Sequence, residues 1–317
     1  MSATPPPVSS SHESPVSLPA RSSAHSPASL TDLAARLRAA GCVFAEDEAE
    51  LLASAAGTAE EFDAMAERRA AGLPLEHVLG WAEFCGTRIA VEPGVFVPRR
   101  RTEFLVRQAA ALTGPGALVV DLCCGSGALG AALAAAVAPA EQRPYGGGES
   151  YHGSASYEPV ERLGRIELHA ADVDPAAVRC ARRNVAAAGG HVHEGDLYEA
   201  LPRRLRGRIE VLLANVPYVP SGSVSLLPAE ARVHEPLVAL DGGADGLDVL
   251  RRVAAGAARW LAPGGSVLME TGEAQAGEAA AAMESLGLTA RVAGCEELGA
   301  TVLIGTRPAG EASEGPR

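Results

Sequence analysis

The residues best suited to chemistry are Asn215, Val216, Pro217 and Tyr218, which directly follow the apolar run 211–214. Such a run predicts a buried strand, and ligands of open α/β sheets bind where strands end. An Asn side-chain oxygen and the next backbone carbonyl offer two acceptors to a planar NH2 group, and an aromatic ring can cover its face. The pattern therefore predicts a pocket that aims an amide or amine nitrogen at a methyl sulfonium. Taken alone, the tetrapeptide also fits an Asn-Pro turn with a packing tyrosine.

A second candidate site is the segment Asp121–Gly130, which follows the apolar run 117–120. An acid and a glycine-rich turn between a strand and a helix indicate nucleotide binding. The Gly-x-Gly-x-x-Gly spacing also fits a dinucleotide, and Asp172, which ends the next predicted strand, could bind the ribose of either cofactor. Asp121 favours S-adenosylmethionine, because a carboxylate there can meet its positive amino-acid end but would repel a pyrophosphate.

Both sites need a sheet that brings strand ends together. Short apolar runs predict strands at 117–120, 166–170, Val192, 211–214, 267–269 and 302–304. Helical patterns alternate with these runs. Asp174-Pro175 predicts an N-cap and first turn of a helix that ends at Gly189-Gly190, and a second helix is expected from Asp245 to Leu261. This alternation predicts an α/β domain with a mainly parallel, helix-covered sheet.

Changes in composition along the chain suggest its organisation. Helical patterns begin at Thr31, Ala45 and Ala59, and apolar and polar residues alternate around Gly86-Thr87. We expect a disordered tail (1–29), a small helical domain (30–80), a β-hairpin connector (81–98), an α/β domain (99–307) with a surface insertion (139–163), and a disordered end (308–317).

Composition limits the function classes. With 27 basic and 39 acidic residues the net charge is -12, which argues against a broad grip on nucleic acid. Arg99–Arg101 and Arg203–Arg208 could touch RNA locally, although solvated arginine faces are the commoner outcome. The six cysteines form no CxxC pair and no metal-ligand spacing, so no metal is expected. No apolar stretch reaches the roughly 20 residues that span a bilayer. No secretory signal pattern is visible, and a cytoplasmic location is expected.

Further segments resemble the protein-(glutamine-N5) methyltransferase family, whose members modify release factors or ribosomal proteins. The resemblance covers about Leu73 to Gly305. Besides the two sites it includes Pro74–Gly80, Val91–Arg99 with Thr102-Glu103, Gly195–Leu197, Glu235-Pro236 and Leu240–Leu247 with Arg251. It implies a helical substrate-recognition domain, a hairpin, and a seven-stranded Rossmann-like class I methyltransferase domain with an antiparallel last strand.

The resemblance also implies S-adenosylmethionine as cofactor and assigns residue roles. The methionine end and ribose would be held by Asp121 and by the turn residues Cys123, Cys124, Gly125, Ser126 and Gly127. Asp172 would take the ribose hydroxyls, and Asp196 with Leu197 the adenine. Asn215, Val216, Pro217 and Tyr218 would hold the target amide, with Asn215, Pro217 and Tyr218 as catalytic residues and Asn215 also next to the cofactor.

Several positions depart from the family pattern and suggest a divergent paralogue. Cys123 stands where the family usually has glycine, which an L-residue tolerates only if its dihedral angles suit it. Val216 replaces the first of two prolines, and Arg100-Arg101 replaces a Pro-Glu pair. Leu298–Thr301 lacks the charged end that the family usually carries.

We therefore expect N5-methylation of a glutamine side chain in a translation protein, a release factor or a ribosomal protein, by a monomeric enzyme that meets nucleic acid only indirectly. Two alternatives remain. An N6-adenine nucleic-acid methyltransferase uses a similar Asn-x-Pro-Tyr pocket, but a broad basic face and a target-recognition insertion are not evident. The second alternative is a catalytically inactive module that binds S-adenosylmethionine. The intact Asn215 argues against this alternative.

Overall fold

The structure, a computed structural model, describes residues 27–138 and 165–309. The chain forms two compact units, residues 1–67 and 68–317. The predictions for residues 1–26, 139–163 and 310–317 lie outside the described residues.

The first unit is helical, as predicted. It contains α1 (Pro27–Ala39), α2 (Ala45–Ala55) and most of α3 (Ala59–Ala70), with Leu37 and Leu52 completely buried. The predicted start of the first helix at Thr31 is wrong, because the helix begins at Pro27 and includes the last residues assigned to the tail. Proline suits the first turn of a helix, where its missing N–H is not needed.

The second unit begins with a short helix, α4 (Leu75–Leu79), and a β-hairpin. Strands β1 (Trp81–Phe84) and β2 (Thr87–Ala90) pair antiparallel, with Phe84 opposite Thr87. The turn consists of Cys85 and Gly86, whose φ angles are 50° and 70°, so it lies one residue earlier than predicted. Two consecutive positive φ angles are the type I′ geometry that matches the twist of a hairpin.

A seven-stranded sheet forms the centre of this unit, in the order β5-β4-β3-β6-β7-β9-β8. Its strands are β3 (Leu118–Leu122), β4 (Glu167–Asp172), β5 (His191–Glu194), β6 (Ile209–Ala214), β7 (Leu261–Thr271), β8 (Thr289–Cys295) and β9 (Ala300–Thr306). Strands β3 to β7 pair in parallel and β9 pairs antiparallel with both neighbours, so the predicted last strand is confirmed. Strand β8 was not found by its own pattern, because as an edge strand it has no apolar run.

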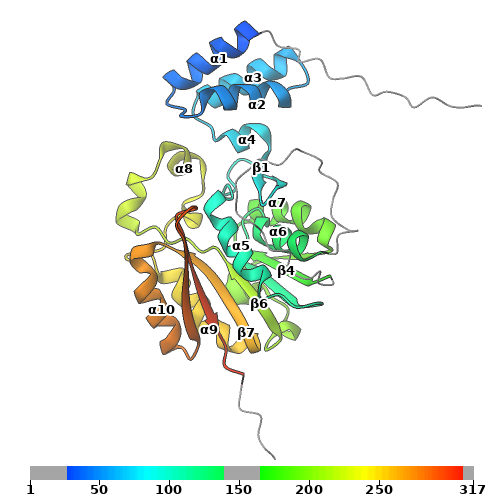
Figure 1. Cartoon of the computed structure of the whole chain (residues 1–317), viewed down its shortest axis with the longest axis vertical. Helices are drawn as coiled ribbons and strands as arrows, with labels where there is room; N and C mark the ends of the chain where they lie inside the picture. The colour runs from blue at the N-terminus through cyan, green and yellow to red at the C-terminus, as the bar shows by residue number, and fades with distance from the viewer. Residues whose placement is uncertain (1–26, 139–164, 310–317) are drawn as a thin grey trace, which may run out of the picture. The chain divides into compact units, whose positions relative to one another are not determined.

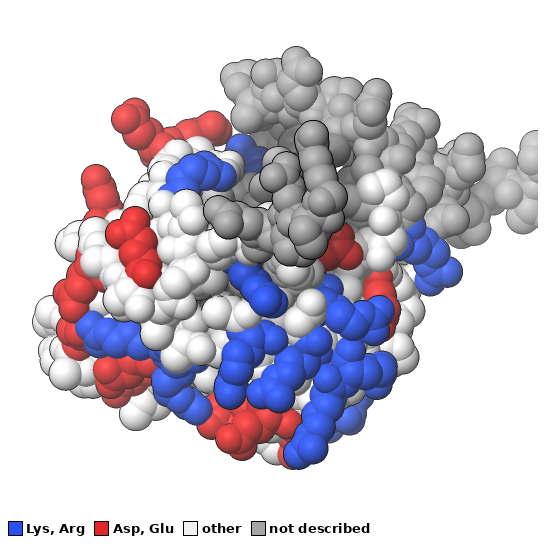
Figure 2. Space-filling view, turned by 90° about the horizontal axis from the view of Figure 1, so that it is seen from below, with Lys and Arg blue, Asp and Glu red and all other residues white. Residues whose placement is uncertain are grey.

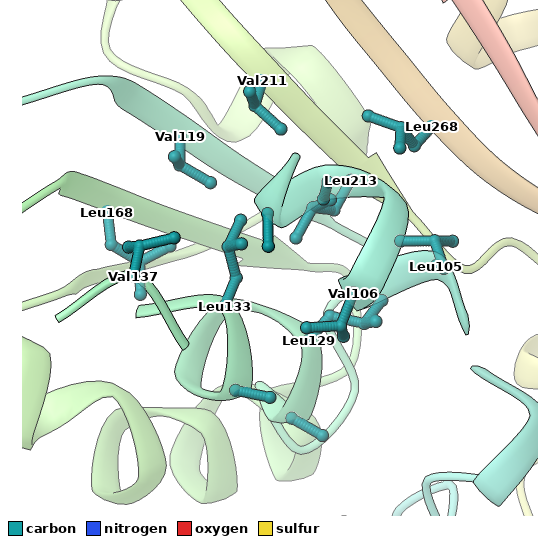
Figure 3. Close-up of a cluster of buried hydrophobic side chains, with 14 of the residues drawn as sticks. Leu105, Val106, Val119, Leu129, Leu133, Val137, Leu168, Val211, Leu213 and Leu268 are labelled. Carbon is teal, nitrogen blue, oxygen red and sulfur yellow. The ribbon is translucent and has the colours of Figure 1, made fainter. Parts of the chain in front are cut away.

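Helices cover both faces of the sheet (Figure 1). Helices α5 (Glu103–Ala110), α6 (Ala128–Val137) and α7 (Pro175–Val185) pack on one face, and α9 (Asp248–Trp260) and α10 (Ala276–Ser285) pack on the other. Alternate strand residues supply the two cores: Val119, Val211 and Leu213 face the first group (Figure 3), whereas Val120 and Leu212 face the second. The predicted helix-covered parallel sheet is thus confirmed.

The start of α7 follows the prediction and the start of α9 does not. Asp174 caps α7, because its Oδ1 accepts a hydrogen bond of 2.8 Å from the Ala176 backbone N–H. Helix α9 begins at Asp248 rather than at Asp245. The Asp245 carboxylate instead accepts hydrogen bonds from the Leu247 N–H at 3.0 Å and from Arg251 at 2.7 Å, which fixes the preceding turn.

Charge is spread unevenly over the surface. The chain is acidic and contains no lysine, yet one face shows arginine side chains gathered together (Figure 2). The four arginines of the segment 203–208 are exposed and make no ion pair with other described residues. Within the described part of the chain no helix is long and apolar enough to cross a membrane.

Candidate active site

A cavity of about 610 Å³ opens at the carboxyl ends of β3, β4 and β6. Strand β3 pairs with β4 on one side and with β6 on the other, so the order of strands reverses here. This is where open α/β sheets bind ligands, and the volume is within the range of small-molecule sites. The predicted residues that line it are Cys123, Cys124, Gly125, Ser126, Asp172, Asp196, Leu197, Asn215, Val216, Pro217 and Tyr218. Asp121 and Gly127 lie outside the lining of the cavity.

The glycine-rich turn connects β3 to α6. Gly125 and Gly127 have φ angles of 54° and 76°, and Gly127 is the N-cap of α6. A Cβ atom on Gly127 would lie 3.1 Å from the Ala181 Cα atom, so glycine is needed there for close helix packing as well. Cys123 has a φ of 52°, the left-handed region that L-residues rarely adopt. The backbone dihedral angles at Cys123 therefore do not suit an L-residue, and the cysteine is strained there.

Asp121 is completely buried beneath the turn. Its Oδ2 accepts a hydrogen bond of 2.9 Å from the Gly130 N–H, whereas its Oδ1 has no partner among the described residues. Burial, with a smaller contribution from the nearby Asp172 charge, raises the pKa of Asp121 to about 7. The unpartnered oxygen lies beneath the turn and outside the lining of the cavity.

Two further carboxylates lie along the cavity. Asp172 ends β4 and accepts hydrogen bonds from the Gly125 N–H at 2.8 Å and the Asp174 N–H at 2.9 Å, which leaves lone pairs for ligand hydroxyls. Desolvation raises the pKa of Asp172. Asp196 is not free, because its Oδ2 pairs with Arg252 at 2.5 Å, and both side chains line the cavity.

Asn215 and its neighbours form the other half of the cavity. The Asn215 Oδ1 is buried and has no hydrogen-bond partner among the described residues. Val216 is buried, and the Tyr218 hydroxyl donates a hydrogen bond of 2.9 Å to the Glu270 Oε1. Desolvation raises the pKa of Tyr218, so its hydroxyl stays protonated. A buried amide oxygen without a partner is the acceptor that a planar NH2 group requires.

The backbone of this segment is held from behind. Cβ atoms on Gly242 and Gly246 would lie 2.6 Å from the Pro217 carbonyl oxygen and 2.3 Å from the Tyr218 carbonyl oxygen, so only glycine permits this approach. Gln275 donates hydrogen bonds of 3.1 Å to the Tyr218 carbonyl and 2.8 Å to the Asp245 carbonyl. These contacts give a physical reason for the glycine-rich segment 240–247.

Ion pairs and an amide fix the segments around the cavity. Arg99 contacts both carboxylate oxygens of the buried Glu235 at 2.6 Å, and Arg101 pairs with Glu270. The charges of the two arginines are therefore paired locally with Glu235 and Glu270. Asn184 joins the hairpin to the glycine-rich turn, because its Nδ2 donates to the Ala90 carbonyl at 2.8 Å and to the Ser126 carbonyl at 2.7 Å.

Sequence reasoning missed Arg252, Asn184, Glu270 and Gln275. Only Glu270 carried a usable signal: it is an acid at the carboxyl end of the predicted strand 267–269, as Asp121 and Asp172 are at the ends of theirs. The other three lie on helices or in loops, where a polar residue is ordinary. Within the described residues, no group of three or more His, Cys, Asp or Glu side chains could hold a metal ion.

The sheet topology, together with a glycine-rich turn and an Asn-x-Pro-Tyr segment on one cavity, defines a class I, S-adenosylmethionine-dependent methyltransferase. No protein-family model matches the chain. Several curated proteins, in contrast, are similar to the chain in sequence. The release factor glutamine methyltransferase of Streptomyces coelicolor is 34% identical over 226 residues, 69% of this chain and 71% of that protein. The enzyme of the same name from Geobacter sulfurreducens is 34% identical, over 66% of this chain and 64% of that protein.

A third relative has another name. The 4-amino-L-phenylalanine/4-methylamino-L-phenylalanine methyltransferase of Streptomyces pristinaespiralis is 36% identical, over 66% of this chain and 64% of that protein. Among solved structures, a methyltransferase from Pyrococcus furiosus is similar with a TM-score of 0.47 and 16% identity, covering 70% of this chain and 90% of that one. From the sequence identities and the shares aligned, the chain belongs to the family of release factor glutamine methyltransferases.

Proposed function

We propose that this chain methylates the side-chain amide nitrogen of a glutamine in a translation protein, a release factor in the first place and a ribosomal protein in the second. The observation that carries the proposal is the buried, unpartnered Oδ1 of Asn215 in a cavity shared with a glycine-rich turn. Two of the similar proteins are named release factor glutamine methyltransferases. In this proposal the enzyme works in the cytoplasm as a monomer.

The cofactor half of the cavity fits S-adenosylmethionine. We assign its amino-acid end to Asp121 and the turn Cys123–Gly127, and its ribose to Asp172. For adenine we assign Leu197 and Asp196, whose carboxylate is shared with Arg252. The cofactor supplies a methyl group on a positively charged sulfur.

The acceptor half has to activate a poor nucleophile, since the lone pair of an amide nitrogen is delocalised. In our proposal the Asn215 Oδ1 and the Val216 carbonyl accept the two N–H groups, while the Tyr218 ring covers the planar face of the amide. This holds the nitrogen in line with the methyl carbon. When bound, S-adenosylmethionine would supply the methyl group to this nitrogen, and solvent would take the proton that the nitrogen loses.

A second candidate acceptor is the aromatic amine of a free amino acid. One observation favours it: the relative from Streptomyces pristinaespiralis, named for 4-amino-L-phenylalanine, is as similar to this chain as the release factor enzymes are. An arylamine also presents a planar NH2 group to Asn215. The N6-adenine alternative is weaker, because Arg99 and Arg101 at the cavity are occupied by ion pairs and leave little charge for phosphates.

Acceptor assays with methyl-labelled S-adenosylmethionine test the proposal. We expect label in purified release factor from the same organism, and none in the variant whose target glutamine is replaced by glutamate, which lacks the NH2 group. Free 4-amino-L-phenylalanine, assayed in parallel, should stay unlabelled. Label in the amino acid and not in the protein would overturn the glutamine proposal. Label in a cell lysate that nuclease removes and protease does not would point to nucleic acid.

A further inference from the structure

Arg101, Tyr218 and Glu270 form a closed cluster beside the acceptor half of the cavity. The Arg101 Nε donates to the Glu270 Oε1 at 2.9 Å, the Tyr218 hydroxyl donates to the same oxygen at 2.9 Å, and the Arg101 Nη2 donates to the Tyr218 hydroxyl. Arg101 and Tyr218 line the cavity, and Glu270 lies at the end of β7 behind them. Three distant segments therefore meet at one tyrosine hydroxyl.

The cluster depends on the arginine charge. The Glu270 side chain is only 2% exposed, and its Oε2 has no hydrogen-bond partner among the described residues. A buried carboxylate is costly unless a cation pairs with it, and Arg101, whose side chain is 47% exposed, is the one described cation that does so. Without Arg101, Glu270 would be buried next to Tyr218 with no opposite charge.

The cluster fixes the tyrosine at both ends. Its hydroxyl is held by Arg101 and Glu270, while its backbone carbonyl accepts a hydrogen bond of 3.1 Å from Gln275. A ring held in this way can move little against the group that packs on it. A carboxylate at position 101 could not take the place of Arg101, because it would put a second negative charge beside the buried Glu270.

We propose that Arg101 is a positioning residue for methyl transfer: through Glu270 and the Tyr218 hydroxyl it fixes the tyrosine ring that covers the acceptor group, while Asn215 holds that group from its edge. The inference rests on the proposed function for the place of the acceptor, but not on the acceptor being glutamine. Arg101 touches neither the reacting nitrogen nor the methyl group in this proposal, so its effect is transmitted through Tyr218 alone.

The test is a double-mutant cycle between Arg101→Gln and Tyr218→Phe, with kcat and KM measured on whichever acceptor the wild-type enzyme labels. Arg101→Gln should lower kcat by between about 10- and 100-fold, the scale of a small misplacement of a reacting group. Tyr218→Phe removes the hydroxyl through which Arg101 acts, so the double variant should be no slower than the slower single variant. Arg101→Lys, which keeps the charge, should recover most of the rate.

Two controls separate positioning from general damage. Arg100→Gln removes the neighbouring arginine, which is exposed and outside the cavity lining, and should leave kcat unchanged. All variants should bind S-adenosylhomocysteine with wild-type affinity, which also shows that they are folded.

The outcomes decide two different questions. The positioning role would be overturned if the double variant lost kcat by the product of the two single losses. It would also be overturned if Arg100→Gln and Arg101→Gln lowered kcat equally. Activity on 4-amino-L-phenylalanine in place of glutamine would overturn the proposed function, while the same cycle measured on that acceptor would still decide the role of Arg101.

Discussion

The two halves of the cavity are built in different ways. The cofactor half consists of a backbone turn and two carboxylates: the Gly125 N–H donates a hydrogen bond to Asp172 at the end of β4, and the Gly130 N–H donates one to Asp121. The acceptor half depends on side chains from distant segments: the Tyr218 hydroxyl contacts Glu270 and Arg101, and the Tyr218 carbonyl contacts Gln275. The first half needs two neighbouring strands, β3 and β4, with the turn and helix that follow β3, whereas the second also needs β6 and β7. Substitutions in the two halves should therefore have separable effects.

The largest difference between the effect on cofactor binding and the effect on kcat is expected for a substitution of Asn215. Asn215→Ala should keep wild-type affinity for S-adenosylhomocysteine and lose roughly 10²–10³ in kcat, the scale for one oriented polar group in a transition state. Calorimetry and initial rates measure the two effects. Asn215→Asp is the matched control, because it keeps an oxygen of the same reach while adding a charge. Rates near wild type in Asn215→Ala would remove the amide clamp from the mechanism.

A substitution of Asp172, in the cofactor half, should have the converse effect: weaker cofactor binding with little change in kcat. Asp172→Ala should weaken S-adenosylhomocysteine binding by about 1–3 kcal/mol, or roughly 5- to 150-fold, because charge-assisted bonds to the ribose are lost. The effect on kcat at saturating cofactor should be small. Because Asp172 also accepts from the Gly125 and Asp174 N–H groups, Asp172→Asn separates turn geometry from ribose binding. Unchanged affinity in both variants would place the ribose elsewhere.

The pH dependence of binding should follow Asp121. Burial raises its pKa from 3.8 to about 7, so the carboxyl group is protonated below neutrality and ionised above it. A cationic ligand group prefers the ionised form, and S-adenosylhomocysteine should bind more tightly as the pH rises from 6 to 8. At pH 6, one unit below the pKa, the affinity should be up to about tenfold weaker. Asp121→Asn keeps the acceptor for the Gly130 N–H and should flatten the profile. A wild-type profile that is already flat would remove Asp121 from cofactor binding.

The same group should also affect folding, with the opposite sign. Because the pKa of Asp121 is higher in the folded chain than in the unfolded chain, the folded chain binds more protons between about pH 4 and 7. This contribution to stability is present at low pH and is lost as the pH rises towards 7. Ligand binding and stability should therefore change in opposite directions across this interval.

The contrast between the halves also explains what the sequence could predict. Asp121, Asp172 and the glycine-rich turn were predictable, because each stands at the end of an apolar run and local patterns place it at the sheet edge. Glu270 could have been found by the same rule. The pairing of Arg101 with Glu270 and of Arg252 with Asp196 spans 169 and 56 positions, and no periodicity in the sequence links such residues. The prediction of where α9 begins was wrong for a related reason. The Asp245 side chain forms a turn by accepting a hydrogen bond from the Leu247 N–H, and this turn competes with helix formation there.

The smallest expected effect concerns the turn itself, where two adjacent cysteines differ in backbone conformation. Cys123 has a φ of 52° and is partly exposed, whereas Cys124 is buried and has no positive φ. A left-handed conformation costs an L-residue about 1–2 kcal/mol, which Cys123→Gly would remove, while the greater freedom of glycine in the unfolded chain costs roughly 0.5–1 kcal/mol. Cys123→Gly should therefore raise the free energy of unfolding by between about 0 and 1.5 kcal/mol. Cys124→Gly loses buried contacts without relief of strain and should be destabilising by about 1–3 kcal/mol. Urea denaturation of the two variants measures the difference, and equal destabilisation would mean that the conformation of Cys123 stores no strain.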